Sequence, residues 1–413
     1  MLSGYRALDL TDQNGYLCGR VLADLNVDVI KVEPPGGDPG RRIGPFYRDV
    51  ADREESLYWY AYNLGKRGIT LRLDSPVGRE LFLDLVKTAD FVIESFPVGH
   101  MRSLGLGYEV LQRANPGLIM GSITGFGQTG PYSDFEGPDI VVMGMGGLMY
   151  LTGDSDRPPV RISFPTAYLL ASLQAAAGML IALEYRERTR LGQHVDVSAQ
   201  ESCCHTLINS LSTWELNGIL ISRAGPFWCR AGGKEELQQR VIWPCRDGSV
   251  AYMIMGGRSG VRSNRSLTEW MENEGIVDEF LRSIDWETFD MATASQEFYQ
   301  KVEEIIGRFF MSHKKAELYE EATKRGIFLQ PVADTRDILE SSQLGARDFW
   351  IEIDHPELDR HITYPGPFVK ASEDCLKLGP RATLIGEHNR DIFVEELGMS
   401  GTVFEDLKRR GII

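Results

Sequence analysis

Short runs of β-branched and apolar residues alternate with segments of helical periodicity along the first 200 residues. The runs predict strands at residues 7–10, 27–33, 68–73, 90–94 and 118–124. Helices are expected at residues 15–25 and from Ser75 onward, because serine before proline is typical of a helix N-terminus. Strands that alternate with helices form a parallel sheet covered by helices. The N-terminal part is therefore predicted to be a Rossmann-like, doubly wound α/β domain.

A long apolar segment, AYLLASLQAAAGMLIALEY, occupies residues 167–185. Its length approaches the roughly 20 residues that a helix needs to span a bilayer. The polar Ser172 and Gln174, the alanine content and the charged ERTR that follows favour a buried helix. A further strand of the sheet is expected at residues 194–197.

Aromatic and polar residues replace the alternating pattern between residues 223 and 326. This segment contains a Gly232-Gly233 step and the hairpin-like VIWPCRDGSVAYMIM, with a turn expected at Asp247-Gly248. We interpret the segment as a smaller inserted domain. Residues 301–324 are strongly helical, and αβ structure is expected to return from residue 327.

The composition is that of a folded chain with two domains or one large insertion: 413 residues, 43% hydrophobic and 25% charged. The net charge of −15 argues against a nucleic-acid or anionic-membrane partner, since either requires a clustered positive field. The six cysteines form no CxxC pair, and the first residues lack the order of a signal peptide. We expect a cytoplasmic protein whose partners are small molecules or other proteins.

Glycines and arginines follow the second predicted strand in VIKVEPPGGDPGRR, residues 29–42. Backbone amides and a guanidinium group there suit a phosphate, although a solvated loop has the same pattern and no GxGxxG fingerprint is present. Ser95-Phe96 follows another predicted strand, and ligands of open α/β sheets bind beyond the carboxyl ends of strands. Phe96 therefore either contacts a cofactor or packs in the core.

Two groups of potential metal ligands occur in the sequence, and neither predicts a metal site. Cys203, Cys204 and His205 are adjacent on an expected helix, where neighbouring side chains point in different directions. His355 and His361 are expected in a solvated, proline-containing loop. No metal cofactor is therefore expected.

Six segments resemble signature segments of the family III coenzyme A (CoA) transferases, which include formyl-CoA and carnitine CoA-transferases. They are, in the family's own order, LADLNVDVIKVEPPGGDPGR, NLGKRGITLRLDSPVGRELF, ESFPVGHMRSLGLGYEVLQRANPGLI, SITGFGQTGPY, HPELDRHITYPGPF and LIGEHNRDIF. The resemblance implies a large Rossmann-like domain of residues 1–223 and 326–413, with a small inserted α/β domain at 224–325. It also implies two protomers interlocked like linked rings.

By the same resemblance, CoA lies against the N-terminal domain, and the substrates are an acyl-CoA and a small carboxylic acid. The positions that match the family's cofactor contacts are Gln13, Asn14, Gly15, Arg41, Lys66, Leu71, Ser95, Phe96 and Arg102. The chain departs from the family at three positions. The family's asparagine is Ser95 here, its arginine matches Ser103, and its basic position falls near Glu136. CoA carries phosphates, so the loss of cations weakens the expected binding.

In the resembled family, an aspartate at the start of a long apolar helix attacks the acyl-CoA thioester and forms a mixed anhydride. The released thiolate converts the anhydride to an aspartyl-CoA thioester, from which CoA passes to the acceptor acid. On an ungapped match after Pro158-Pro159-Val160, this position is Tyr168. A phenol with a pKa of about 10 is mostly un-ionised at neutral pH, and a tyrosyl ester is not an anhydride. No catalytic residue is therefore predicted in this chain.

Three hypotheses follow from the resemblance. The leading one is a non-catalytic subunit of a heteromeric transferase whose Asp-bearing paralogous subunit supplies the nucleophile, with succinyl-CoA:benzylsuccinate CoA-transferase as the precedent. The second is a catalytically silent CoA- or acyl-CoA-binding scaffold or sensor. The third is a self-sufficient transferase with a displaced carboxylate, Asp154 or Asp156. Racemisation is not expected, because the racemases' Gly-His-Asp segment is Gly137-Pro138-Asp139 here.

Overall fold

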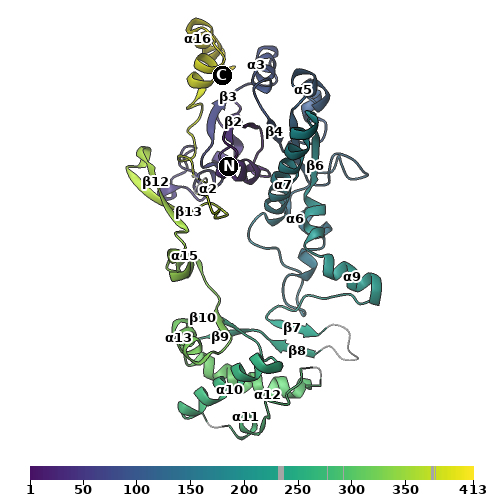
Figure 1. Cartoon of the computed structure of the whole chain (residues 1–413), viewed down its shortest axis with the longest axis vertical. Helices are drawn as coiled ribbons and strands as arrows, with labels where there is room; N and C mark the ends of the chain where they lie inside the picture. The colour runs from purple at the N-terminus through teal and green to yellow at the C-terminus, as the bar shows by residue number, and fades with distance from the viewer. Residues whose placement is uncertain (231–236, 277, 292, 374–375, 377) are drawn as a thin grey trace. The chain divides into compact units, whose positions relative to one another are not determined.

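The chain divides by its internal contacts into two compact units, which Figure 1 shows in a computed structural model. The structure describes residues 1–230, 237–276, 278–291, 293–373, 376 and 378–413, so Gly232 and Gly233 lie outside the described residues. The larger unit consists of Met1–Met149, Arg161–Leu207 and Ser342–Ile413, and the smaller of Tyr150–Val160 and Ile208–Ser341. The predicted insert at 224–325 falls within the smaller unit, and the domain assignment itself stays a prediction.

A six-stranded parallel sheet forms the centre of the larger unit, in the order β3-β2-β1-β4-β5-β6. Its strands are β1 Arg6–Asp9, β2 Asp28–Glu33, β3 Arg67–Thr70, β4 Phe91–Glu94, β5 Ile119–Thr124 and β6 His194–Ser198. These strands match the six runs predicted from the sequence, and most of their residues are buried, as expected for parallel strands. The order reverses between β1 and β4. The prediction of a doubly wound α/β fold is confirmed.

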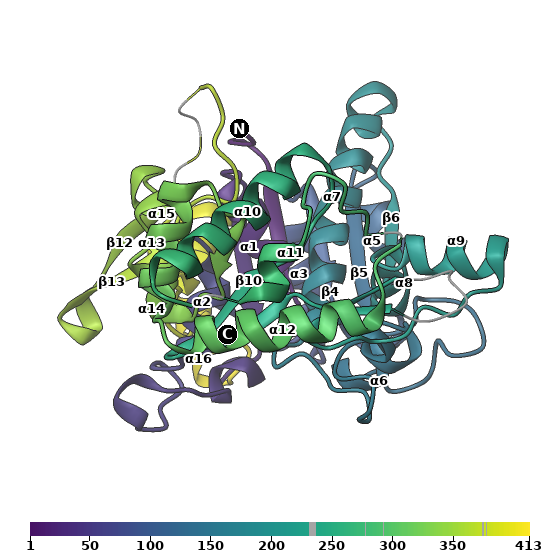
Figure 2. The same ribbon diagram turned by 90° about the horizontal axis from the view of Figure 1, so that it is seen from below.

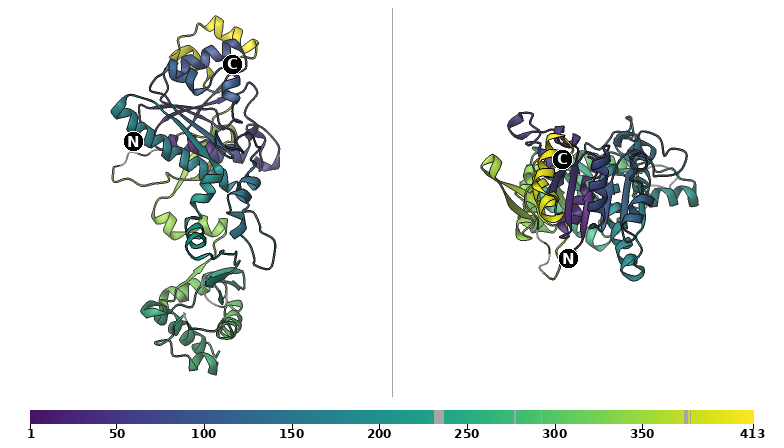
Figure 3. Two further views of the ribbon diagram at one scale, coloured as in Figure 1. Left: turned by 90° about the vertical axis from the view of Figure 1, so that its right-hand side faces the viewer. Right: turned by 90° about the horizontal axis from the view of Figure 1, so that it is seen from above.

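Helices cover both faces of this sheet, which Figure 3 shows from two sides. The helices on one face are α1 Tyr16–Asp24, α6 Asp139–Met145, α7 Thr166–Thr189 and α8 Ala199–His205. Those on the other face are α3 Pro76–Val86, α5 Tyr108–Ala114, the π-helical η5 Asp391–Glu396 and α16 Gly401–Arg409. The predicted start of α3 is confirmed, since Ser75 Oγ accepts a hydrogen bond from Gly78 N at 2.9 Å. The C-terminal helix α16 thus shares a hydrophobic core with α3 and α5, which come from the N-terminal part of the chain.

The apolar segment predicted as a buried helix is α7. Among the described residues it is the one helix that passes a length-and-composition test for crossing a membrane. Ala171 and Met179 on one face of α7 are fully buried against the sheet, while Leu173 and Ile181 on another face are 47% and 72% exposed. In this chain α7 is a half-buried helix of the larger unit.

The edge strand β3 is covered by side chains from the C-terminal part of the chain. Gly68 N donates to His388 Nδ1 at 3.1 Å, and Thr70 N donates to Asn389 Oδ1 at 2.8 Å. Unpaired amide groups on an edge strand invite pairing with other chains, so these contacts protect the edge.

Two antiparallel strands, β12 Trp350–His355 and β13 Arg360–Pro365, form a hairpin in the larger unit. His355 and His361, expected in a solvated loop, lie on these strands instead. The side chain of His355 is buried, with Nδ1 2.9 Å from Glu357 Oε1 and Nε2 2.9 Å from Tyr364 Oη. The proline after His355 suggested a loop, but it only begins the short turn η4, Pro356–Leu358.

The smaller unit contains a three-stranded antiparallel sheet, in the order β11-β10-β9, and the two-stranded sheet β7-β8. The strands are β7 Phe227–Arg230, β8 Leu237–Arg240, β9 Ile242–Cys245, β10 Gly248–Tyr252 and β11 Leu329–Pro331. The helices, several of which Figure 2 shows, are α9 Ile208–Asn217, α10 Gly257–Asn273, α11 Glu279–Ser283, α12 Gln296–Met311, α13 Lys315–Arg325 and α14 Thr335–Leu339. The predicted hairpin is confirmed, but its turn is Arg246-Asp247, because Gly248 already pairs with Cys245.

The segment 301–324, predicted as one helical stretch, is divided between α12 and α13. The break follows Met311, where Ser312 Oγ donates to Phe309 O at 2.7 Å and His313 Nδ1 lies 3.0 Å from the same oxygen. Side chains that compete for helix carbonyl groups end helices. The remaining short elements are α2 Leu57–Asn63, α4 His100–Ser103, α15 Ser342–Ala346, η1 Pro39–Arg42, η2 Tyr47–Asp49 and η3 Met149–Leu151.

Candidate functional site

The carboxyl ends of β1 and β4 meet where the strand order reverses, and ligands of open α/β sheets bind at this position. We call the two loops that follow these strands, residues 10–15 and 95–99, the switch-point loops. Ser95 ties them together, because its Oγ donates to Asp12 Oδ1 at 2.8 Å and accepts from Asp12 N at 2.9 Å. The structure thus brings Ser95 together with the loop that carries the turn Gln13-Asn14-Gly15.

Glu94, the last residue of β4, fixes the second switch-point loop. Its Oε2 accepts a hydrogen bond from Phe96 N at 2.7 Å, and the half-buried Phe96 ring lies 4.7 Å from the His100 ring, centroid to centroid. Burial raises the pKa of Glu94 to about 7, although hydrogen bonds from Ser122 and Phe96 N lower it. Glu94 therefore changes its charge near neutral pH.

Tyr168 lies in the first turn of α7, and its side chain is turned inward. The hydroxyl donates to Gly137 O at 2.5 Å, and the residue is 5% exposed. Burial raises the pKa of Tyr168 far above its ordinary value, and the nearby carboxylates Asp12 and Asp139 raise it further. The phenol is therefore protonated at neutral pH.

Asp139 holds the start of α7 next to Tyr168. Its Oδ1 accepts a hydrogen bond from Ala167 N at 2.9 Å, while its Oδ2 is buried with no hydrogen-bond partner among the described residues. Farther along α7, Ser172 Oγ lies 3.4 Å from Asn14 O, which places the helix against the first switch-point loop.

The side chain of Arg41, a predicted cofactor contact, is buried and bound within the protein. Its Nε and Nη2 bind the two carboxylate oxygens of Glu33 at 2.6 and 2.8 Å. Nη2 also donates to Thr383 O at 2.8 Å, and Nη1 donates to Glu54 Oε2 at 2.7 Å. The guanidinium group is therefore occupied by a buried carboxylate and its neighbours.

The predicted contact Lys66 is bound in the same way. Its Nζ donates to Asp9 Oδ2 at 2.8 Å and to Tyr16 O and Asn63 Oδ1 at 2.9 Å each. These three acceptors use all three N–H groups of an ammonium ion.

The remaining predicted cofactor contacts differ in exposure. The side chain of Arg102 is 78% exposed and lies 3.4 Å from Glu109 in a surface ion pair. Leu71 is buried directly after β3, where its N donates to Glu33 O at 2.7 Å. Of the three predicted cofactor cations, Arg102 alone presents its charge to solvent.

The two carboxylates considered as displaced nucleophiles belong to the smaller unit. Asp154 Oδ2 lies 3.9 Å from Arg157 Nε, and Asp154 O accepts a hydrogen bond from Arg223 Nε at 2.9 Å. Asp156 is exposed. Both have the surroundings of ordinary loop carboxylates.

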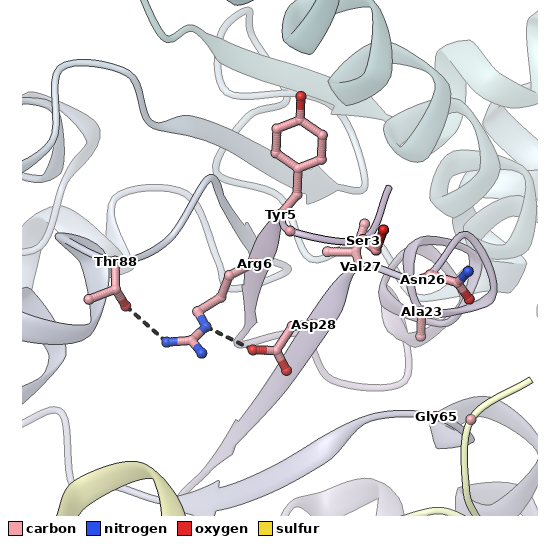
Figure 4. A pocket seen from close by; sticks show the side chains of 11 residues that line it. Ser3, Tyr5, Arg6, Ala23, Asn26, Val27, Asp28, Gly65 and Thr88 are labelled. Atoms are coloured by element: carbon pink, nitrogen blue, oxygen red, sulfur yellow. Dashed lines mark hydrogen bonds and ion pairs between the residues drawn. The ribbon is translucent and has the colours of Figure 1, made fainter. Parts of the chain in front are cut away.

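A cavity of about 520 Å³ lies at the opposite end of the sheet, next to the amino ends of β1 and β2 (Figure 4). Its wall includes Arg6, whose Nε donates to Asp28 Oδ2 at 2.8 Å and whose Nη1 donates to Thr88 Oγ1 at 3.2 Å. None of the predicted site residues lines this cavity. It is therefore separate from the switch-point loops.

Among the described residues, no group of three or more His, Cys, Asp or Glu side chains is arranged to hold a metal ion. Cys203, Cys204 and His205 lie on α8, the expected helix. Burial raises the pKa of the Cys203 thiol to about 11, so this thiol is un-ionised at neutral pH.

Asp9, Asp12 and Glu94 are part of the site but were not among the residues predicted from the sequence. Asp9 and Glu94 are the last residues of β1 and β4, and Asp12 follows in the first switch-point loop. For Asp9 and Glu94 the available signal is a carboxylate at the end of a strand, where ligands of open α/β sheets bind, whereas Asp12 has no such signal.

An open parallel sheet whose strand order reverses between β1 and β4 defines a doubly wound α/β protein. The sequence model of CoA-transferase family III matches residues 2–389, and the chain belongs to this family. The resemblance seen in the six sequence segments is therefore confirmed.

Relatives match along at least 95% of the chain. The chain is 36% identical to the succinyl-CoA:(R)-benzylsuccinate CoA-transferase subunit BbsE of Thauera aromatica, over 100% of this chain and 98% of the relative. It is 30% identical to the succinyl-CoA–D-citramalate CoA-transferase of Chloroflexus aurantiacus, over 97% and 94%. The crystal structure of a CAIB/BAIF family protein from Brucella suis has a TM-score of 0.80 and 30% identity, over 95% and 98%.

Proposed function

We propose that this chain is a non-catalytic subunit of a heteromeric family III CoA-transferase, which moves CoA from an acyl-CoA donor to a carboxylic acid. The observation that carries the proposal is that Tyr168, at the position that the sequence match gives to the nucleophile, is buried with its hydroxyl bonded to Gly137 O. The similarity to subunit BbsE supports a heteromeric enzyme. Succinyl-CoA is the proposed donor, because the names of several relatives contain it.

Transfer by the proposed route requires a carboxylate on the enzyme. The carboxylate attacks the thioester carbonyl carbon, the C–S bond breaks, and CoA leaves as a thiolate that can attack the resulting anhydride. A tyrosine would have to lose its proton first, and the ester formed would not return the acyl group to the thiolate as an anhydride does. Tyr168 therefore takes no covalent part in the proposed reaction.

The proposed partner is an Asp-bearing paralogous subunit, interlocked with this chain in the cytoplasm. The exposed apolar residues Leu173 and Ile181 on α7 support burial of this face in an assembly. Bound CoA would contact Gln13, Asn14 and Phe96 of the switch-point loops, and no metal is part of the proposed reaction.

The first test is the composition and labelling of the complex purified from the protein's own host. Native mass spectrometry is expected to show a stoichiometric paralogue with Asp at the position of Tyr168. During turnover with succinyl-CoA, hydroxylamine is expected to convert that partner aspartate to a hydroxamate and to leave Asp139, Asp154 and Asp156 of this chain unmodified.

Two outcomes would contradict the proposal. If the purified chain alone moves CoA between acids at an ordinary enzymatic rate, or if one of its own carboxylates is labelled, it is a self-sufficient transferase. A homo-oligomer that binds CoA in a calorimetric titration but transfers nothing would instead be a silent scaffold or sensor.

Replacing Tyr168 by phenylalanine is expected to leave kcat of the assembled enzyme within about twofold of the unmodified value, because the hydroxyl only binds Gly137 O. The lost hydrogen bond lowers the free energy of unfolding by about 1 kcal/mol. Tyr132→Phe, at an exposed tyrosine, is the matched control. A loss of about 100-fold in kcat for Tyr168→Phe alone would give the phenol a catalytic role.

A further inference from the structure

Two buried lysines bind backbone carbonyl groups near the start of the first switch-point loop and directly after its end. Lys31, on β2, donates to Thr11 O, and Lys66, directly before β3, donates to Tyr16 O at 2.9 Å. Lys31 is 0% exposed and Lys66 is 1% exposed. The segment between these carbonyl groups contains the turn Gln13-Asn14-Gly15. Two buried cations thus bind the backbone around the loop that is predicted to contact CoA.

Asp9, at the end of β1, connects the two lysines. Its Oδ2 lies 2.8 Å from Lys66 Nζ, and its Oδ1 lies 3.8 Å from Lys31 Nζ. Oδ1 also accepts hydrogen bonds from Thr11 N at 2.9 Å and from Thr11 Oγ1 at 2.6 Å. Lys31 Nζ also lies 3.3 Å from Oδ2 of the buried Asp38, so two carboxylates and two ammonium groups surround the backbone where the loop begins.

The packing around this cluster leaves little room for another arrangement. A Cβ atom on Gly19 would lie 2.2 Å from Asp9 Oδ2 and 3.1 Å from Lys66 Nζ. A Cβ atom on Gly15 would lie 2.5 Å from Thr11 Cγ2. Helix α1 and the loop before it therefore pack directly onto the cluster, which favours a single loop conformation.

We propose that Lys31 and Lys66 are positioning residues, which hold the turn Gln13-Asn14-Gly15 in the shape that receives CoA and do not themselves contact its phosphates. A phosphate that reached Lys66 would have to displace Asp9, Tyr16 O or Asn63 from a buried site. The assignment of CoA as the ligand of this turn rests on the proposed function. The fixing of the loop by the two lysines does not depend on it.

The test compares Lys66→Met and Thr11→Val with the control Arg67→Met in the full chain. Arg67 is also a partly buried cation, but it pairs with Asp28 and Glu396 at the other end of the sheet. Hydrogen exchange of residues 10–17 is expected to become about tenfold faster in Lys66→Met, to rise less in Thr11→Val, and to stay unchanged in Arg67→Met.

Titrations with CoA and with pantetheine, which lacks the nucleotide phosphates, provide the second readout. If Lys66 positions the loop, Lys66→Met weakens both ligands by the same factor. Loss of affinity for CoA alone would show a phosphate contact and overturn the proposal, as would unchanged exchange in residues 10–17. Thr11→Val keeps both lysines, so it decides the outcome if Lys66→Met does not fold. If the unmodified chain binds neither ligand, the proposed cofactor role fails, while the exchange result still decides whether the loop is clamped.

Discussion

Replacing Arg41 by methionine is expected to lower the free energy of unfolding by about 3–5 kcal/mol, because a buried carboxylate then loses its partner. Glu33 is 0% exposed, and Arg41 binds both of its oxygens, at 2.6 and 2.8 Å. The guanidinium group also lies over the Trp59 ring, 3.9 Å from its centroid. Chemical denaturation followed by circular dichroism measures the loss.

Arg42→Met is the matched control for this substitution. Arg42 is the exposed neighbour of Arg41, so its replacement is expected to change the free energy of unfolding by less than about 0.5 kcal/mol. Adding Glu33→Gln to Arg41→Met should recover part of the loss, since it removes the unpaired charge. If Arg41→Met lowers the free energy of unfolding by less than about 1 kcal/mol, burial of the Glu33 carboxylate does not depend on its pairing with Arg41.

Replacing Glu94 by glutamine is expected to stabilise the chain at pH 8 by up to about 3 kcal/mol and to have little effect at pH 4. Burial raises the pKa of Glu94 from its ordinary 4.5 to about 7, so the folded chain holds this proton more tightly than the unfolded chain. The contribution of Glu94 is therefore favourable at low pH and is lost as the pH rises from about 4.5 to about 7. Glutamine has no charge to bury and keeps an oxygen that can accept from Phe96 N.

Unfolding curves collected between pH 4 and pH 8 test this expectation. Glu80→Gln, at an exposed position on α3, is the control and should follow the pH dependence of the unmodified chain. If Glu94→Gln shows the same pH dependence as the unmodified chain, the carboxyl group of Glu94 is not protonated near neutral pH in the folded state.

The strands of the large sheet could be predicted because their signal is local. Runs such as VDVIKVE, residues 27–33, consist of β-branched residues bounded by turn residues, and no distant contact is needed to recognise them. The hairpin β12–β13 shows the limit of this approach. Its first strand ends at His355-Pro356, and proline suggested a loop, although the alternation in WIEIDH is that of a strand.

The orientation of charged side chains could not be predicted from the sequence. Arg41 follows β2 and Lys66 precedes β3, positions at which phosphate-binding cations also occur. The local sequence does not show whether such a side chain points outward or inward. Their partners decide this, and some of these lie far along the chain: Arg41 binds Thr383 O as well as the nearby Glu33, and Lys66 binds Asp9 as well as the nearby Asn63. The inward direction of Tyr168 likewise depends on Gly137, a residue of another segment.

The contacts between the last part of the chain and the first have a consequence for how the protein is made. Thr383 O accepts hydrogen bonds from Arg41 and Trp59, and His388 covers the edge of β3. Because a ribosome delivers the chain from its N-terminus, the first sheet strands emerge about 300 residues before the segment that completes their surroundings. The larger unit of this protein therefore reaches its final form only after nearly all of the chain has been synthesised, and until then the edge of β3 is available to chaperones or to other chains.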